Sequence, residues 1–432
     1  MLVRFAGALR RLREKAGQPP YRELGARAHV SASALSAAAG GRKLPSLTIT
    51  LAYVRACGGD SDEWEKRWYE VAAELAQQTE PEPLEPAVRA PYVGLSAFQE
   101  SDADLFFGRQ ELLAKLSVRV RGNRLVAVVG ASGAGKSSLL RAGLLPELRT
   151  ETSIVIMMTP GQHPIEECAV QFATPLGSSP AMLVDDLSEN SRGLHRLVRQ
   201  ALASRPDDTE LILIVDQFEE LFTLCGDQRE RTRFIELLVT GATAGNSRVR
   251  IVLGVRADFY GHCSRYPQLV EVLQDHQVVI GPMSGQDLRD AITKPANRVN
   301  CSVESALLAT LCTHADGEAG VLPLLSHALL ETWRRRRGNS LSLAGFQAAG
   351  GIDGALQQSA EAVYRSLEPR QRQVAADLFL RLTALGEGTA DTKRRITRAE
   401  LDSQDPDLAL VLERLAAARI AHPRPRHGRD RS

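Results

Sequence analysis

The stretch NRLVAVVGASGAGKSSLLRAGLLPEL, residues 123–148, decides the fold of this chain. An apolar run typical of a buried strand ends at Gly130, and a helical pattern begins near Lys136. Between them the sequence matches GxxxxGK[ST], a glycine-rich turn whose backbone N–H groups point inward and bind phosphate groups. The positive end of the following helix adds to this attraction. The stretch therefore predicts a binding site for a nucleoside triphosphate.

The side chains of this turn have expected roles. Lys136 should reach the β- and γ-phosphates, and the hydroxyl of Ser137 should bind Mg²⁺. Further contacts to the nucleotide are expected from Gly130, Ser132, Gly133, Ala134, Gly135 and Ser138. The alternative is a chance glycine-rich turn, which the strand before it and the helix after it make the weaker explanation.

A second apolar run, LILIVDQFEELF at residues 211–222, ends in acidic side chains. Asp216 closes the strand pattern, where a carboxylate can hold Mg²⁺ directly or through water, across from Ser137. Glu219 and Glu220 follow, and either could orient an attacking water. The alternative is that both glutamates are only the solvated start of a helix.

Composition narrows the class of protein. Hydrophobic residues make up 44% of the 432 residues and charged residues 24%, as is ordinary for soluble globular proteins. The net charge of +1 gives the whole molecule no strong attraction to nucleic acid or membrane, so such contacts need a local patch. The cysteines are scattered without a CxxC pair, and no apolar run reaches the roughly 18 residues of a membrane span. We expect a cytoplasmic protein without a zinc site or disulfides.

The pattern from about residue 124 to 283 alternates between strands and helices. The runs LVAVVG, SIVIMM, LILIVD and RIVLGV are typical of buried parallel strands. This alternation predicts an α/β core around a parallel sheet.

Several motifs in combination resemble a known family. The strand that ends in Asp216 with two acids after it resembles the signalling NTPases of the STAND class, which include the NACHT and NB-ARC switches. PYVGLSAFQESDADLFFGRQELLAKL, residues 91–116, is similar to the segment that leads into the core of the bacterial novel STAND NTPases. In that group a Gly-Arg-x-Glu piece, here Gly108, Arg109 and Glu111, lies beside the nucleotide. The resemblance therefore implies that Arg109 contacts it.

Two later stretches carry the same resemblance. IVLGVRADFYGHC, residues 251–263, resembles the strand and sensor arginine of the group, which implies that Arg256 senses the γ-phosphate. GEAGVLPLLSHALLETW, residues 317–333, resembles the start of a helix in the group, which implies that Pro323 contacts the adenine. From the residues alone, Arg256 could instead pair with a neighbouring acid, and Pro323 could simply open a helix.

The resemblance covers about residues 91–416, including GGIDGALQQSAEAVYRSL at 350–367, which is similar to the approach to a winged helix. With the proline-rich stretch at 77–91, it predicts a multidomain chain. The expected divisions are a helix-turn-helix domain at 1–76, a Pro/Glu-rich linker and lead-in segment at 77–100, a P-loop NTPase domain at 101–283, a helical lid at 284–338, a winged-helix-like region at 339–418 and a basic disordered tail at 419–432.

The resemblance also implies a working cycle. The lid and the winged helix are expected to bury bound ADP at rest. Exchange for ATP is expected to open the molecule and lead to homo-oligomers; the choice of ATP over GTP rests on the resemblance. Slow hydrolysis would use Lys136, Ser137 and Asp216 for charge and metal, with Glu219 or Glu220 placing the water. Two alternatives are a DNA-binding transcriptional regulator gated by nucleotide, and an ADP-locked scaffold that does not hydrolyse. No membrane contact is expected, and the sequence does not indicate which protein partner the chain would bind.

Residues 21–39 have helix-turn-helix spacing: YRELGARA, the turn HVS, then ASALSAAAG. The region resembles a Cro-like (Xre-type) helix-turn-helix over roughly residues 4–56, whose second helix would enter the major groove. The residues that could contact bases or phosphates are Ser31, Ser33 and Ser36, followed by Arg42 and Lys43 on the DNA backbone. Because residues 31–39 lack arginine, lysine, asparagine and glutamine, the alternative is a helical adaptor that holds a partner or another part of the chain.

Members of the resembled group often continue into a WD-repeat sensor, and this sequence ends at residue 432 without one. Residues 418–432, ARIAHPRPRHGRDRS, cannot pack as a core, so we expect a chain truncated in its winged helix. The alternative is a basic arm that binds nucleic acid.

Overall fold

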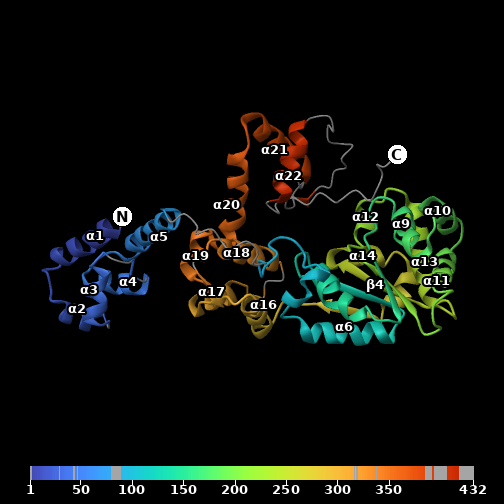
Figure 1. Ribbon diagram of the computed structural model, residues 1–432, viewed down its shortest axis with the longest axis horizontal. Coiled ribbons are helices and arrows are strands. Elements are labelled where there is room, and N and C mark those ends of the chain that lie inside the picture. Colours follow the sequence, from blue (N-terminus) through green and yellow to red (C-terminus); the bar gives the residue numbers. More distant parts are fainter. Residues whose placement is uncertain are drawn as a thin grey trace.

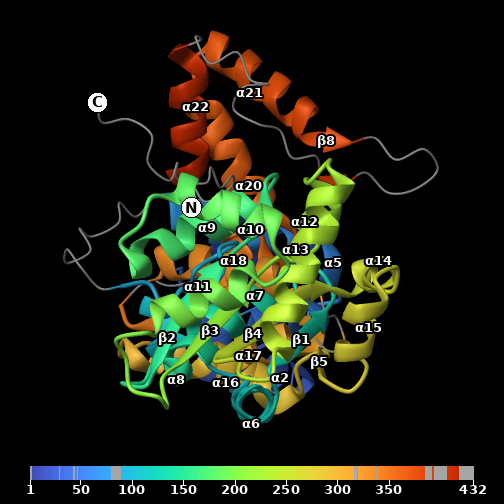
Figure 2. The same cartoon turned by 90° about the vertical axis from the view of Figure 1, so that its right-hand side faces the viewer.

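The computed structural model describes residues 2–28, 30–41, 44–45, 47–78, 89–315, 317, 320–336, 338–384, 392–393 and 406–417. Figure 1 shows the N-terminal helices at one end of the molecule and the α/β core at the other. Further helices lie between these two parts, and α20 to α22 rise above them in Figures 1 and 2. The predicted linker residues 79–88 and the predicted basic tail, 419–432, lie outside the described residues.

The core is a parallel sheet with the strand order β2-β3-β4-β1-β5. Its strands are β1 (Leu125–Gly130), β2 (Ser153–Met158), β3 (Glu210–Val215), β4 (Val249–Arg256) and β5 (Gln277–Ile280). The apolar runs of the sequence form β1 to β4, which confirms the predicted α/β core. The sequence did not predict β5, because this strand has only 4 residues, of which Val279 is 64% exposed.

Parallel pairing brings the carboxyl ends of the strands to one edge of the sheet. The register aligns Gly130 at the end of β1 with Arg256 at the end of β4. On the other side of β4, Val215 at the end of β3 lies opposite Leu253. The glycine-rich turn, Asp216 and Arg256 therefore all start from this edge.

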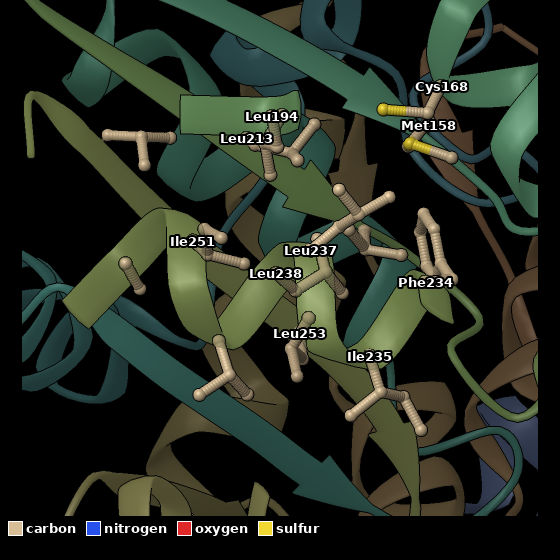
Figure 3. Close-up of a cluster of buried hydrophobic side chains, with 14 of the residues drawn as sticks. Met158, Cys168, Leu194, Leu213, Phe234, Ile235, Leu237, Leu238, Ile251 and Leu253 are labelled. Atoms are coloured by element: carbon tan, nitrogen blue, oxygen red, sulfur yellow. The ribbon is translucent and has the colours of Figure 1, made fainter. Parts of the chain in front are cut away.

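Helices cover both faces of the sheet, because alternate residues of each strand face opposite sides. On β1, Leu125 packs into one cluster of buried side chains and Val126 into the other. Figure 3 shows the first cluster, in which Leu213 of β3 and Leu253 of β4 lie with Leu238 of α13. The helices of the first cluster are α9 (Pro164–Leu176), α10 (Pro180–Glu189), α11 (Gly193–Ala201), α13 (Gln228–Thr243) and α15 (Pro267–Leu273). Those of the second are α6 (Gln110–Gly122), the π-helical η2 (Leu139–Leu144) and α8 (Leu145–Leu148). The short α7 (Lys136–Ser138) precedes η2.

Short helical turns complete the core: η1 (Glu100–Leu105), α12 (Glu220–Thr223), η3 (Ala257–Phe259) and α14 (Tyr260–Cys263). We use the name lid region for α16 (Gly285–Arg298), β6 (Ser302–Val303), α17 (Ser305–Ala315), α18 (Leu322–Arg334), β7 (Ser340–Leu341) and α19 (Leu343–Ala348). It extends beyond the predicted helical lid, residues 284–338, because β7 and α19 share its hydrophobic core. This region has a hydrophobic core of its own, and Tyr92 of the lead-in segment (residues 91–100) is buried in it. The hydroxyl of Tyr92 donates a hydrogen bond to the carbonyl of Ile292 at 2.7 Å. The lead-in segment is therefore packed against the lid region.

The N-terminal helices form a separate small core. They are α1 (Leu2–Lys15), α2 (Tyr21–Ala28), α3 (Ala32–Ala38), α4 (Leu47–Ala56) and α5 (Ser61–Gln78). Trp64 and Trp68 of α5 share a helical face and are buried in this core. Helix α5 also contacts α19. The amide of Gln347 on α19 donates a hydrogen bond to the hydroxyl of Tyr69 on α5 at 3.0 Å. Helix α5 thus joins the N-terminal helices to the lid region.

The C-terminal elements are α20 (Gly351–Ser366), α21 (Pro369–Leu382), β8 (Thr383–Ala384), β9 (Thr392–Lys393) and α22 (Pro406–Ala417). Helices α21 and α22 pack through a small core that includes Leu378 and Val411. Strands β8 and β9 pair antiparallel over two residues each. The described part of this region is mostly helical, and its assignment as a winged helix stays a prediction. None of the helices in the described ranges combines the length and the hydropathy that a membrane crossing requires.

Candidate nucleotide site

A cleft of about 280 Å³ opens at the carboxyl edge of the sheet. Its walls come from the glycine-rich turn, the lead-in segment and α18 of the lid region. The predicted site residues that line it are Arg109, Ser132, Gly133, Ala134, Gly135, Lys136, Ser137, Ser138, Asp216, Glu219, Arg256 and Pro323. Gly130 and Glu220 are not part of this lining. The structure therefore brings nearly all of the predicted residues to one place.

The glycine-rich turn needs its glycines for two reasons. Gly133 and Gly135 have φ angles of +77° and +89°, which side-chain-bearing residues rarely adopt. A Cβ atom at Gly133 would also lie 3.0 Å from the carbonyl oxygen of Gly320, which precedes α18. The turn is thus curled as a phosphate-binding turn requires, and it lies directly against the lid region.

Lys136 is buried at the centre of the turn, with 8% of its surface exposed. Its ammonium group donates hydrogen bonds to the carbonyls of Gly130 at 2.7 Å and Ala131 at 2.8 Å. Burial lowers the pKa of Lys136, and the carboxylate of Glu219 opposes this shift. A bound phosphate would give this buried cation a charged partner in place of carbonyl dipoles.

Ser137 and Asp216 meet as the sequence motifs predicted. The Ser137 hydroxyl donates to Oδ1 of Asp216 at 3.1 Å, and Asp216 is only 1% exposed. A hydroxyl and a carboxylate beside a phosphate site form the oxygen donor set that Mg²⁺ prefers in proteins. These two residues therefore fit a Mg²⁺ ion held together with nucleotide phosphates.

The adjacent glutamates have different surroundings. Glu219 lines the cleft, its carboxylate accepts a hydrogen bond from the backbone N–H of Arg256 at 3.3 Å, and burial raises its pKa. Glu220 is 1% exposed and accepts a hydrogen bond from the backbone N–H of Gly161 at 3.2 Å. The solvated-helix alternative is wrong for Glu220, because its side chain is buried. Of the two, only Glu219 is placed at the cleft.

The predicted arginines make contacts within the protein. Arg256 lines the cleft, and its guanidinium pairs with Asp258 at 2.6 and 3.1 Å, the neighbouring-acid contact that the sequence left open. Arg109 is buried and donates to the carbonyls of Gly281 at 2.9 Å and Ala134 at 3.4 Å. Burial lowers the pKa of Arg109. Arg109 thus ties the glycine-rich turn to the backbone after β5.

Pro323 lies in the first turn of α18 and lines the cleft, so the structure is compatible with both of its predicted roles. Around it the wall is apolar, formed by Leu288, Ile292, Leu325 and Leu329. An apolar wall next to a polar phosphate turn suits the flat base of a nucleotide.

Two polar residues near Asp216 were not predicted from the sequence: Arg141, which contacts Asp216, and Gln99, which contacts Arg141. Arg141 on η2 donates to Oδ2 of Asp216 at 3.2 Å and to Oε1 of Gln99 at 3.1 Å. The signal that could have found Arg141 is its helical spacing from Ser137, which places both on one helix face. Nothing in the sequence indicated Gln99.

The predicted DNA contacts lie on and around α3. Ser31 caps this helix, because its hydroxyl accepts the backbone N–H of Ala34 at 3.2 Å, and it lies 3.1 Å from the hydroxyl of Ser33. Ser36 is exposed. Arg42 and Lys43 lie outside the described residues. Ser31 therefore has a structural role as a cap, and the DNA contacts stay predictions.

Comparison with known proteins finds partial matches. The hemin import ATP-binding protein HmuV of Rhodopseudomonas palustris (strain BisA53) is 30% identical over 152 residues, 34% of this chain and 56% of that protein, so the match spans little more than half of that relative. The Walker-type ATPase paby2304 of Pyrococcus abyssi is 18% identical, with a TM-score of 0.41 over 74% of this chain and 91% of that chain. The Aeropyrum pernix ORC1 protein, solved in complex with DNA, is 16% identical, with a TM-score of 0.42 over 74% of this chain and 86% of that one. These structural likenesses are too weak to carry an argument.

Two protein families match directly. Residues 4–66 match a helix-turn-helix domain, which covers α1 to α4 and the start of α5. Residues 91–424 match the family described as Novel STAND NTPase 1, from the lead-in segment through the sheet and the lid region. With its nucleotide-binding fold and an N-terminal helix-turn-helix domain, this chain belongs to the Novel STAND NTPase 1 family.

Proposed function

We propose that this chain is a switch that binds ATP with Mg²⁺, hydrolyses it slowly and changes the contact between its core and its lid region as it does so. One observation carries this proposal: Ser137 Oγ and Asp216 Oδ1 lie 3.1 Å apart in a cleft that residues of α18 also line. A nucleotide in this cleft would contact both the phosphate turn and the lid region. The charge of its phosphates would therefore affect how the lid region packs against the phosphate turn.

The residues divide the work of hydrolysis. Lys136 would exchange its carbonyl partners for the phosphates, and Ser137 and Asp216 would hold the metal. The chemistry that Mg²⁺ supplies when bound is neutralisation of phosphate charge during transfer to water. Glu219 would orient that water and accept its proton, and a pKa raised by burial favours this role.

The first test identifies the bound nucleotide. Wild type, Lys136→Ala and Lys115→Ala are purified in parallel and denatured, and the released nucleotide is analysed; phosphate release from added ATP is then followed. Lys115 is the matched control, because it is exposed on α6 and pairs only with Glu111 among its described partners. We expect near-stoichiometric ADP and slow hydrolysis from wild type and Lys115→Ala, and neither from Lys136→Ala. Wild type that carries no nucleotide and fails to bind added ATP would overturn the proposal.

A second function is DNA binding through the helix-turn-helix domain, coupled to the switch. The match of residues 4–66 to a helix-turn-helix domain supports DNA binding. The hydrogen bond between Tyr69 and Gln347 supports the coupling, because it connects this domain to the lid region, which lines the cleft. Gel shifts with random and selected duplexes, at several salt concentrations and with ADP or ATP, test this function. A sequence preference at physiological salt that depends on the nucleotide supports it; a steep salt slope without preference means phosphate contact only. In that case the adaptor alternative is favoured.

Homo-oligomers in the ATP state are a further part of the proposal. Light scattering of wild type and Glu219→Gln with ADP or ATP tests it, since the variant should keep ATP unhydrolysed. A mass that stays that of one chain in every state would count against assembly.

A further inference from the structure

Arg141 reaches the metal-site carboxylate from the helix that follows the glycine-rich turn. Ser137 Oγ donates to Oδ1 of Asp216 at 3.1 Å, and Arg141 Nη2 donates to Oδ2 at 3.2 Å. Arg141 lies on η2, a π-helical segment, and such segments are uncommon and recur at functional sites. The two carboxylate oxygens are therefore held by different donors, and one of those donors is a cation.

The same guanidinium also contacts the lead-in segment. Its Nη1 donates to Oε1 of Gln99 at 3.1 Å, and next to it the backbone N–H of Phe98 donates to Ser138 Oγ at 3.1 Å. Among the described residues, the buried Nε of Arg141 has no hydrogen-bond partner. A buried donor without a partner costs free energy, so this side-chain position depends on the two contacts made by Nη1 and Nη2.

A guanidinium and Mg²⁺ cannot share Asp216 without cost. Asp216 is 1% exposed and the side chain of Arg141 is 30% exposed, so water screens the repulsion between two cations at this carboxylate only in part. Resting on the function proposed above, we propose that Arg141 is a positioning residue that competes with Mg²⁺ for Asp216 and, through Gln99, couples metal binding to the lead-in segment. Coupling between two sites is reciprocal, so a change at Gln99 alters the affinity for Mg²⁺.

The test measures Mg²⁺ affinity by binding rather than by turnover. The full chain is stripped of nucleotide, and N-methylanthraniloyl-ADP fluorescence is followed as MgCl₂ is titrated. We expect Arg141→Met to lower the Mg²⁺ concentration at half-saturation by about tenfold, because a competing charge is removed. A half-saturation that is unchanged or higher would overturn the competition.

Two further variants separate charge from packing. Arg149→Met is the matched control, because it removes the same charge at a position away from Asp216. Arg149 pairs with Glu100 at the end of the lead-in segment. The Mg²⁺ concentration at half-saturation of this variant should stay within about twofold of wild type. Arg141→Lys keeps the charge and should stay close to wild type. If Arg141→Met does not fold, Arg141→Lys still tests the proposal. A tenfold drop in the Mg²⁺ concentration at half-saturation for Arg141→Lys would contradict the role of charge.

A double-mutant cycle tests the connection to the lead-in segment. Gln99→Leu in wild type should lower the half-saturation by about twofold to threefold, because Arg141 loses one of its two anchors. In the Arg141→Met background the same change should have no effect. Equal effects of Gln99→Leu in both backgrounds would overturn the coupling.

The failures are distinguishable. If wild type binds no labelled nucleotide at any MgCl₂ concentration, the proposed function fails. If wild type binds it with a Mg²⁺ requirement that Arg141→Met leaves unaltered, only the role of Arg141 fails.

Discussion

Glu219 and Glu220 are neighbours in the sequence, yet their carboxylates accept hydrogen bonds from different parts of the core. Glu219 accepts the backbone N–H of Arg256, at the end of β4, and Glu220 accepts that of Gly161, beyond β2. Only Glu219 lines the cleft. The separation follows from the short helix α12, which begins at Glu220 and turns consecutive side chains about 100° apart.

This difference predicts opposite outcomes for the same substitution. Glu219→Gln should slow phosphate release by about 100-fold or more, because the amide cannot accept the proton of water, and should leave ATP affinity nearly unchanged. Glu220→Gln keeps an acceptor for Gly161 and should change phosphate release by less than about threefold. Single-turnover assays and ATP titrations of both variants make the check. Equal losses in the two variants would refute the assignment of Glu219.

Arg256 is held by Asp258 and also lines the cleft, so its sensing role can be tested through its partner. Arg256→Ala should weaken ATP binding by about tenfold and leave ADP binding unaltered, because only ATP has a γ-phosphate. Asp258→Asn should free the guanidinium and favour ATP. The ratio of ATP to ADP affinity, measured for both variants, gives the answer. A ratio equal to that of wild type in both would leave Arg256 as part of a structural ion pair.

The contact between Tyr69 and Gln347 should respond to removal of one hydroxyl. Tyr69→Phe removes the part-buried hydrogen bond from Gln347, worth about 1 kcal/mol, and also the hydrogen bond from the same hydroxyl to Glu65 within α5. Only the first of these reaches α19, so amide exchange of α19 as well as α5 should rise, by about fivefold, while that of β1 stays unchanged. Tyr364→Phe is the control, because Tyr364 lies on α20 and is 41% exposed. Unchanged exchange in α5 and α19 would show that this bond does not hold the helix-turn-helix domain to the lid region.

The burial of His327 predicts that the stability of the protein falls at acidic pH. It lies on α18, is 1% exposed, and its Nε2 is 3.0 Å from the hydroxyl of Ser359 on α20. Burial lowers the pKa of His327 below the roughly 6.5 of an unfolded histidine, so below about pH 6.5 the unfolded state binds more protons than the folded state. The contribution of His327 is therefore complete above that pH and is lost as the pH falls toward its folded pKa.

The measurement compares denaturant unfolding of wild type and His327→Gln at about pH 7.5, 6.5 and 5.5. These values bracket the pKa of an unfolded histidine, which is about 6.5. Wild type should lose up to about 1 kcal/mol more per pH unit than the variant. His195, whose pKa is also lowered by burial, remains in both proteins and cancels in the comparison. Parallel curves for the two proteins would contradict the prediction.

Much of the fold followed from local sequence features. The apolar runs gave β1 to β4, and the glycine-rich turn required the backbone that Gly133 and Gly135 adopt. Buried parallel strands are apolar along their whole length, which is why they stand out in a sequence. Strand β5 was missed because it has only 4 residues, too few for a clear apolar run, and one of them, Val279, is exposed.

The sequence by itself determined the elements that one stretch of chain specifies: the phosphate turn, the strand before Asp216, and the helix-turn-helix pattern. Only the tertiary structure decided which glutamate lies at the cleft, that Arg141 holds Asp216, and that Tyr69 meets Gln347, 278 residues away. The physical reason is range. Periodicity and turn chemistry act between near neighbours, whereas these contacts depend on strand register and on how separate hydrophobic cores pack together.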